Sequence, residues 1–130
     1  EDLAAAGFGF GDAVIVELLR AKNLLPDLSA IGSGAVLVAC QDDELRPVAM
    51  RAARSMREAG IKVDFVLEPK KMKWIFKQAD RVGVDHVVLF APREAEEGLA
   101  RVKRMADGEQ EEVPIAKLAE WFLKQKPATP

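Results

Sequence analysis

From residue 35 onward, short segments rich in hydrophobic residues alternate with longer segments in which hydrophobic residues recur every three or four positions. Three short segments rich in apolar residues have the length of strands, at 35–40, 62–67 and 86–90. The first is apolar without interruption, which is typical of a strand covered on both faces. Neighbouring strands are separated by segments with apolar residues at helical spacing. Strand, helix, strand, helix and strand in this order predict a parallel sheet with right-handed crossovers.

Both intervening segments have recognisable helix ends. The first begins with a candidate N-cap at Asp42 or Asp43 and ends at Gly60, because glycine suits a helix C-terminus. The second follows Pro69 and ends at Gly83. The apolar stripes predicted to face the sheet are Leu45, Val48, Ala49, Ala52, Met56 and Ala59 in the first helix, and Met72, Ile75, Phe76, Ala79 and Val82 in the second.

The last third of the chain predicts a hairpin and a final helix. A fourth strand is expected over 101–105 and a fifth over 111–113, with Asp107 and Gly108 as the turn. Pro114 is expected at the first position of the helix. Its apolar stripe comprises Ile115, Leu118, Ala119 and Phe122. The hairpin adds an antiparallel edge, so we predict an α/β fold with a mixed sheet of about five strands, three of them parallel, flanked by helices.

The first 34 residues have a different character. Asp12 is a good N-cap for a short helix, and the stretch at 26–34 reads as a linker of proline, aspartate, serine and glycine. The predicted organisation is therefore a leading segment at 1–25, the linker, and an α/β domain at 35–126 that ends in a frayed tail from residue 124.

Glycines recur in the leading segment at Gly7, Gly9 and Gly11. Their spacing matches neither the P-loop nor the dinucleotide-binding pattern, and little chain precedes them for a parallel strand. A strand whose glycines let another backbone approach closely explains them more simply than a nucleotide-binding loop does.

Composition narrows the class of function. The 130 residues are the size of one domain, and 49% hydrophobic residues are enough for a core. A formal net charge of −2 argues against a uniformly basic nucleic-acid binder but allows a local basic patch. A single cysteine, Cys40, excludes an internal disulfide, and with only one histidine, His86, the chain is unsuited to a His/Cys metal site. Both residues fall in apolar strands and are interpreted as packed side chains.

The chain carries no signal of membrane insertion. It has neither a signal peptide nor a run of the roughly 20 apolar residues that a membrane-spanning helix needs. It begins with Glu1 rather than methionine, so we expect a processed protein or a piece of a longer one.

The second predicted helix is the most basic part of the chain. Residues 69–81 hold five positive side chains and one negative one, a local net charge of +4. Helical geometry places Lys73, Trp74 and Lys77 on the half opposite the apolar stripe. An unpaired base could stack on the indole while ammonium groups contact phosphates. A solvated helix face, or a tryptophan covered by the linker or by another domain, explains the same residues about equally well.

A second group of polar residues follows the third strand. Glu94 stands at its carboxyl end, where open α/β sheets bind ligands, and a carboxylate can accept hydrogen bonds from base amino groups. On its own, Glu94 is better explained as a helix or turn cap. Alternation along the fourth strand puts Arg101 and Lys103 on one face and Arg104 on the other. No nucleophile, base and oxyanion-stabilising group combine into a catalytic set in this segment.

Taken in order, these stretches resemble the C-terminal part of histidyl-tRNA synthetases, which are class II aminoacyl-tRNA synthetases. Residues 7–14 resemble the third signature motif of the class. Residues 72–77, Met-Lys-Trp-Ile-Phe-Lys, resemble a helix of the anticodon-binding domain in plant and algal organellar members. The late positions of that domain are matched by Glu94, by Val102 and Lys103, and by Gly108, Glu109 and Gln110.

Two departures from the family pattern stand out. Ala13 and Val14 occupy positions where the wider family usually has Glu-Arg, although organellar members look similar to this chain there. Ala91, followed by Pro92, replaces the usual glycine before the late loop, and we expect this to change the loop around Glu94.

The resemblance implies that 1–25 is the end of a catalytic domain, with Gly7, Gly9 and Gly11 as a remnant of its ATP site. It implies that 35–126 grips the anticodon stem-loop of histidine tRNA. The implied RNA contacts are phosphate binding by Lys73, Lys77, Arg101 and Lys103, stacking by Trp74, and base reading by Glu94.

The resemblance also implies what lies beyond this segment. The presumed full-length enzyme would be a histidine–tRNA ligase that uses ATP and Mg²⁺, while no cofactor, metal or catalytic residue is expected in this segment. Its partners would be tRNA and either a second copy, through the missing catalytic domain, or a larger complex in a chloroplast or mitochondrion.

Two other functions fit the residues. One is a catalytically inactive synthetase-derived paralogue that serves as a structural or interaction module in a larger organellar assembly. The other is a flavodoxin-like domain that binds a small molecule at the carboxyl edge of the sheet, against which the absence of a phosphate loop counts.

Overall fold

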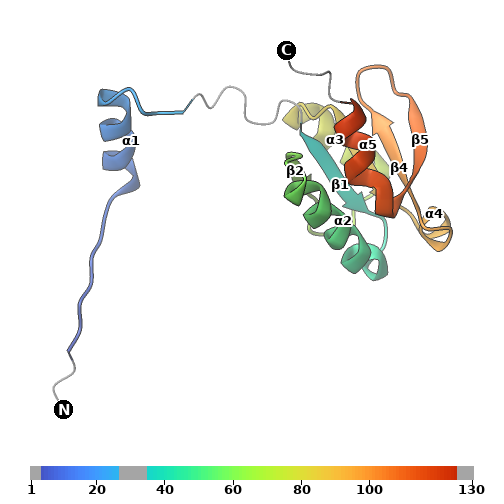
Figure 1. The fold of residues 1–130 in the computed structure, drawn as a ribbon, viewed down its shortest axis with the longest axis horizontal. Helices are drawn as coiled ribbons and strands as arrows, with labels where there is room; N and C mark the ends of the chain where they lie inside the picture. Colours follow the sequence, from blue (N-terminus) through green and yellow to red (C-terminus); the bar gives the residue numbers. More distant parts are fainter. Residues whose placement is uncertain (1–3, 27–34, 126–130) are drawn as a thin grey trace. The chain divides into compact units, whose positions relative to one another are not determined.

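The computed structural model describes residues 4–26 and 35–125 (Figure 1). The chain divides into two units, Glu1–Ile31 and Gly32–Pro130. Within its described residues, the first unit contains helix α1 (Asp12–Ala21), which buries none of its side chains. Apart from Pro26, the predicted linker at 26–34 lies outside the described residues, and so does the tail from residue 126.

Five strands of the second unit form one mixed sheet in the order β2–β1–β3–β4–β5. They are β1 (Val36–Cys40), β2 (Val63–Phe65), β3 (His86–Phe90), β4 (Leu99–Arg104) and β5 (Gln110–Pro114). β1 pairs in parallel with β2 and β3, whereas β4 pairs antiparallel with β3 and β5. The predicted α/β fold, with three parallel strands and an antiparallel edge, is confirmed.

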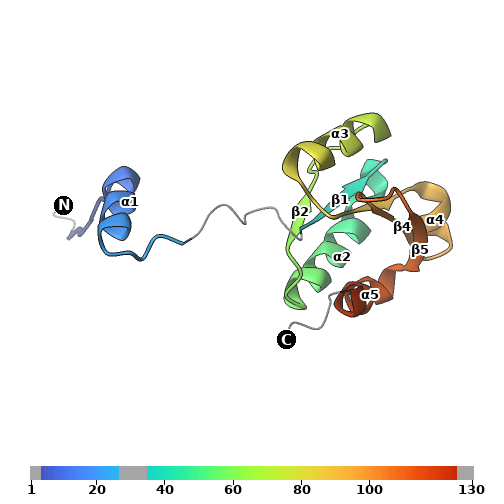
Figure 2. The same ribbon diagram turned by 90° about the horizontal axis from the view of Figure 1, so that it is seen from above.

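Helices lie on both faces of the sheet (Figure 2). One face is covered by α3 (Met72–Val82), and the other by α2 (Arg46–Glu58) and α5 (Leu118–Gln125). The short elements are α4 (Pro92–Glu96) between β3 and β4, and the 3-10 helices η1 (Asp43–Leu45) and η2 (Ile115–Lys117) before α2 and α5. Gly60 and Gly83 follow α2 and α3 with φ of 78° and 73°, so their predicted role as helix stops is confirmed.

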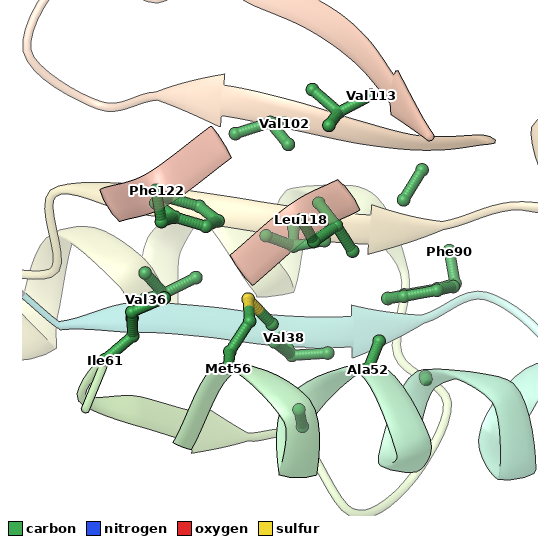
Figure 3. Packing of buried hydrophobic residues seen from close by; sticks show 14 of the residues in the cluster. Val36, Val38, Ala52, Met56, Ile61, Phe90, Val102, Val113, Leu118 and Phe122 are labelled. Carbon is green, nitrogen blue, oxygen red and sulfur yellow. The ribbon is translucent and has the colours of Figure 1, made fainter. Parts of the chain in front are cut away.

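The larger part of the core lies between the sheet and the helices α2 and α5 (Figure 3). Val38 and Phe90, from β1 and β3, meet Met56 of α2 and Leu118 and Phe122 of α5. None of these side chains is more than 5% exposed. Because all five strands contribute to this cluster, the face is apolar across the whole width of the sheet.

The smaller part of the core lies under α3. Leu37, Val87 and Leu89 of the central strands pack against Ile75 and Ala79 of the helix. Among the described residues, β4 and β5 supply no buried side chain to this cluster. The α3 face of the hairpin is therefore left without a helix over it.

Two predicted boundaries shift in the strands. β2 is shorter than the predicted 62–67 because it pairs with β1 over only three residues, Val63–Phe65. Pro114 ends β5 opposite Leu99 instead of beginning a helix, and η2 intervenes before α5. Proline is tolerated there because β5 is an edge strand, where the missing N–H removes no ladder bond that the sheet needs.

Three further details differ in the helices. Asp12 is the first residue of α1 instead of its N-cap, which is Gly11. α5 continues to Gln125, although fraying was expected from residue 124. Helix α4 was not predicted, and Pro92 stands in its first turn. No helix among the described residues is both long and apolar enough to cross a membrane.

Candidate nucleic-acid interface

Helix α3 contacts its neighbours with two different flanks. Phe76 points toward the hairpin, where the Lys103 ammonium lies 4.0 Å from its ring centroid. Trp74 lies about 160° around the helix from Phe76, and its side faces β2. Lys73 and Lys77 lie between these directions and are exposed. The core-facing stripe through Ile75 and Ala79 thus leaves a basic outer surface, as predicted.

The hairpin adds two cations on the same face of the sheet. Arg101 pairs with Leu89 and Lys103 with Val87 across β3 and β4, and both of these partners pack under α3. The predicted alternation is confirmed, because Val102 points to the opposite face and is 2% exposed. Lys103 is held against α3 by its cation–π contact, which brings the strand cation beside the helix cations.

Glu94 and Arg101, two predicted RNA contacts, form an ion pair with each other. Glu94 comes from the first turn of α4, and its side chain is 5% exposed, whereas that of Arg101 is 34% exposed. A carboxylate so deeply buried needs a charged partner, and the guanidinium supplies it. The pair leaves the Arg101 side chain partly exposed, while Glu94 has little surface of its own.

Trp74 stands apart from the hairpin cations. Together with Gln78 of α3, it borders a hollow of about 310 Å³ whose other side is formed by residues 64–68. The indole is 43% exposed, and the Lys70 ammonium lies 5.7 Å from its ring centroid. The predicted contacts are therefore divided between two flanks of one helix, with Lys103 on one and Trp74 on the other.

The lysines of α3 keep their charge available. Among the described residues, neither Lys73 nor Lys77 forms an ion pair, whereas Lys70 is bonded to Glu68 at 2.7 Å. The acidic residue of the helix, Asp80, is exposed on the outer surface as well. Free ammonium groups on a fixed helix are what a phosphate backbone needs for binding.

The sequence reasoning missed three contributors to this face. Phe76 was assigned only to the core stripe, yet it holds Lys103 in place. Asp64 and Gln78, on the two sides of the Trp74 hollow, were not predicted to belong to a site. The helical angle between Trp74 and Gln78, about 40°, was the available signal for Gln78. The sequence pattern did not predict that Asp64 of β2 would lie close to Trp74.

Among the described residues, the structure places no further site around the other candidate residues, which are the glycines of the leading segment and Cys40. A Cβ atom added at Gly7 or Gly9 would meet nothing within 4 Å, and the ATP-site role of the three glycines stays a prediction. Within residues 4–26 and 35–125, no group of three His, Cys, Asp or Glu side chains is placed to hold a metal ion. Cys40 is buried, and burial raises the pKa of its thiol above the usual value, which disfavours a reactive thiolate.

His86 packs at the amino end of β3. Its ring lies edge-on to Trp121 and Phe122 of α5, with ring centroids 5.9 Å and 5.3 Å away. Burial among these rings lowers its pKa below the usual value. The predicted packed histidine is confirmed, and it lies on the face opposite α3.

Comparison with known proteins identifies relatives of this architecture. A family model described as "Anticodon binding domain" matches residues 35–125. A chloroplastic/mitochondrial histidine–tRNA ligase of Arabidopsis thaliana is 44% identical over 91% of this chain and 24% of its own length. The histidine–tRNA ligase of Pyrococcus furiosus is 33% identical over 92% of the chain and 27% of its own length.

A solved structure agrees with these relatives. The histidyl-tRNA synthetase from Nostoc sp. PCC 7120 superposes with a TM-score of 0.67 and 27% identity, over 87% of this chain and 27% of that one. The chain spans about a quarter of the length of the curated relatives that it matches.

Proposed function

Since this chain belongs to the anticodon-binding domain family, we propose that its α/β unit grips the anticodon stem-loop of histidine tRNA. The observation that carries this proposal is the contact of Lys103 with Phe76, which sets a strand cation beside the exposed Lys73 and Lys77 of α3. The three ammonium groups form a basic surface that runs from the outer side of α3 onto the neighbouring face of the hairpin, which no helix covers. Such a surface suits the phosphates of a folded RNA loop.

In this proposal the cations and the other side chains have different tasks. Lys73, Lys77 and Lys103 neutralise phosphates, and the partly exposed Arg101 adds a further positive charge on the hairpin. Glu94 fixes the direction of Arg101 through their ion pair. If Glu94 also reads a base, the RNA must replace Arg101 as its partner, because a buried carboxylate cannot be left unpaired.

The proposal extends to the protein of which this chain covers about a quarter. That protein would be a histidine–tRNA ligase that activates histidine with ATP and Mg²⁺ in a domain beyond these residues. The higher identity to the chloroplastic/mitochondrial relative than to the archaeal one supports an organellar location. Dimerisation would involve mainly surfaces outside this segment. Gly7, Gly9 and Gly11 would be its contribution to the ATP site, although an added Cβ at Gly7 or Gly9 meets no obstacle within 4 Å.

A salt titration tests the proposal. Binding of the histidine-tRNA anticodon stem-loop is measured by fluorescence anisotropy from low to moderate salt, beside a loop with altered anticodon bases. The wild-type chain should bind tightly, with a linear loss of log affinity against log salt concentration, and more weakly to the altered loop.

Removing equal charge from two different faces tests whether the lysines of α3 contact the RNA. The Lys73→Gln, Lys77→Gln double variant should weaken binding and lower the salt slope by about 2, roughly 1 per lost phosphate contact. The control is Arg51→Gln of α2 with Lys117→Gln of η2, which removes the same charge from exposed positions that, among the described residues, form no ion pair. An equal effect of both double variants, or an unchanged slope for the lysine pair, would contradict the assignment.

A further inference from the structure

The hollow beside Trp74 has the chemistry of a base-binding groove, separate from the phosphate-facing cations. Its wall on one side is the half-exposed indole of Trp74, and its floor includes Leu37 and Val66. An indole held at a helix surface offers a flat apolar ring on which an unpaired base can stack. The volume of about 310 Å³ leaves room for one planar ring system.

The rim of the groove carries hydrogen-bond acceptors. Asp64 and Glu68 supply carboxylates, which accept hydrogen bonds only, and Gln78 supplies an amide. Glu68 is already bonded to Lys70 at 2.7 Å, and one oxygen of Asp64 accepts from the Phe65 N–H, so we assign the ligand contacts to the other Asp64 oxygen and to the half-buried Gln78 amide. A ligand suited to this rim must present neighbouring N–H donors. Guanine is the base whose pairing edge places an imino and an amino donor side by side.

The charge next to the groove favours RNA over a protein side chain as the occupant. Lys70 lies over the Trp74 ring, and Lys71 lines an adjoining hollow of about 400 Å³ that also includes Lys70. A nucleotide stacked on the indole would bring its phosphate toward Lys71, since Lys70 is bonded to Glu68. An arginine from a protein partner would suit the carboxylates but would be repelled by both lysines.

We propose that this groove takes an extruded guanine from a single-stranded RNA loop, with Trp74 as the stacking platform and with Asp64 and Gln78 contacting the base edge. The inference rests on the proposed function in that the loop is taken to be the anticodon loop. It adds a specificity-determining site on the β2 flank of α3, away from Arg101 and Lys103.

The test uses the two tryptophans of the 130-residue chain as internal reporters. The indole N–H signals of Trp74 and Trp121 are followed by NMR during titration with the histidine-tRNA stem-loop. The same is done with loops in which each guanine in turn is replaced by inosine, and with short single strands of oligouridine with and without one guanosine. Trp121 donates to Glu111 on the opposite face, at 2.9 Å, and should not shift.

The groove is supported if the Trp74 signal moves and one inosine replacement weakens binding about fivefold, the size of one lost hydrogen bond. Trp74→Leu should lower affinity about tenfold while the salt slope stays the same, since stacking releases no counterions. Asp64→Asn, an exposed substitution that retains the oxygen bonded to the Phe65 N–H, should remove the preference of guanine over inosine.

The outcomes separate this inference from the proposed function. If the stem-loop binds while the Trp74 signal does not shift and both variants behave as wild type, the proposal that the groove binds guanine is overturned and the anticodon role stands. If the stem-loop does not bind but the guanosine-containing strand shifts the Trp74 signal, guanine binding by the groove is supported and the anticodon role is contradicted. If neither RNA binds, both are overturned.

Discussion

The two faces of the sheet are covered to different extents, and this difference separates stability from function in the domain. On one face, α2 and α5 seal a cluster that draws on all five strands. On the other, α3 alone covers the parallel strands and leaves the hairpin open. Strand β4 shows both conditions, because Val102 is buried on the sealed face while Lys103, its neighbour in sequence, meets Phe76 on the open one.

The comparison teaches that a small domain can expose a charged surface without loss of its core. The sealed face is broad enough to bury Phe90, Leu118 and Phe122, and burial of such large apolar side chains stabilises the fold. The open face then needs only one helix to complete the second layer. Substitutions on the sealed face should change stability, and those on the open face should change RNA affinity.

The largest effect is expected at the centre of the sealed face. Phe90→Ala should lower the free energy of unfolding by about 4 kcal/mol, because Phe90 is fully buried and its removal leaves a cavity. Urea denaturation followed by circular dichroism measures this change. Met50→Ala on the outer side of α2, where Met50 is 54% exposed, should stay within about 0.5 kcal/mol. Similar losses in both variants would mean that the cluster is not the main source of stability.

The ion pair between Glu94 and Arg101 should give a smaller loss. Arg101→Met should cost about 2 kcal/mol, since it leaves a buried carboxylate without its charged partner. The double variant with Glu94→Gln should recover part of this loss, because no buried charge then remains. Urea denaturation of the two single variants and the double variant gives the coupling energy, and strictly additive losses would show that the pair does not act as a unit.

Charge on the open face should affect binding more than stability. Lys103→Gln should lower the salt slope of stem-loop binding by about 1 and change the free energy of unfolding by less than about 1 kcal/mol, the size of its cation–π contact. Lys103→Arg preserves the charge and should retain the slope. A loss of slope in the arginine variant would show that shape, and not charge, explains the effect.

The smallest effect concerns pH and belongs to the sealed face. Burial holds the pKa of His86 below its usual value, so the unfolded chain binds more protons than the folded one just below pH 6.5. Stability should therefore be full above that pH and should decline as pH falls through the pKa of folded His86. Three charged neighbours act on the same ring more weakly than burial does: Asp85 and Asp107 raise the pKa of His86, and Arg104 lowers it.

Urea midpoints measured from pH 7.5 to 5 in wild type and His86→Phe test this expectation. The phenylalanine variant keeps an aromatic ring against α5 but cannot titrate, so its profile should be flatter over this range. Identical profiles would exclude His86 as the source of the pH dependence.

Part of the candidate site was readable without a structure. Lys73 and Lys77 follow from helical spacing, and Arg101 and Lys103 share a face because side chains alternate along a strand. Trp74 was recognised as an indole on a polar helix face, and the structure keeps it half-exposed. The meeting of Glu94 with Arg101, and of Phe76 with Lys103, was not predicted, because each joins segments whose distance depends on how the hairpin turns back.

The sequence by itself determined the order of elements, the three parallel strands and the basic outer side of α3. These depend on local periodicity and on glycine stops, which act within a few residues. Only the tertiary structure decided which cation lies beside which helix flank, that Glu94 is buried against Arg101, and that β2 and Trp74 enclose a groove. Those features depend on register and on helix packing angle, which arise from many weak contacts between distant parts of the chain.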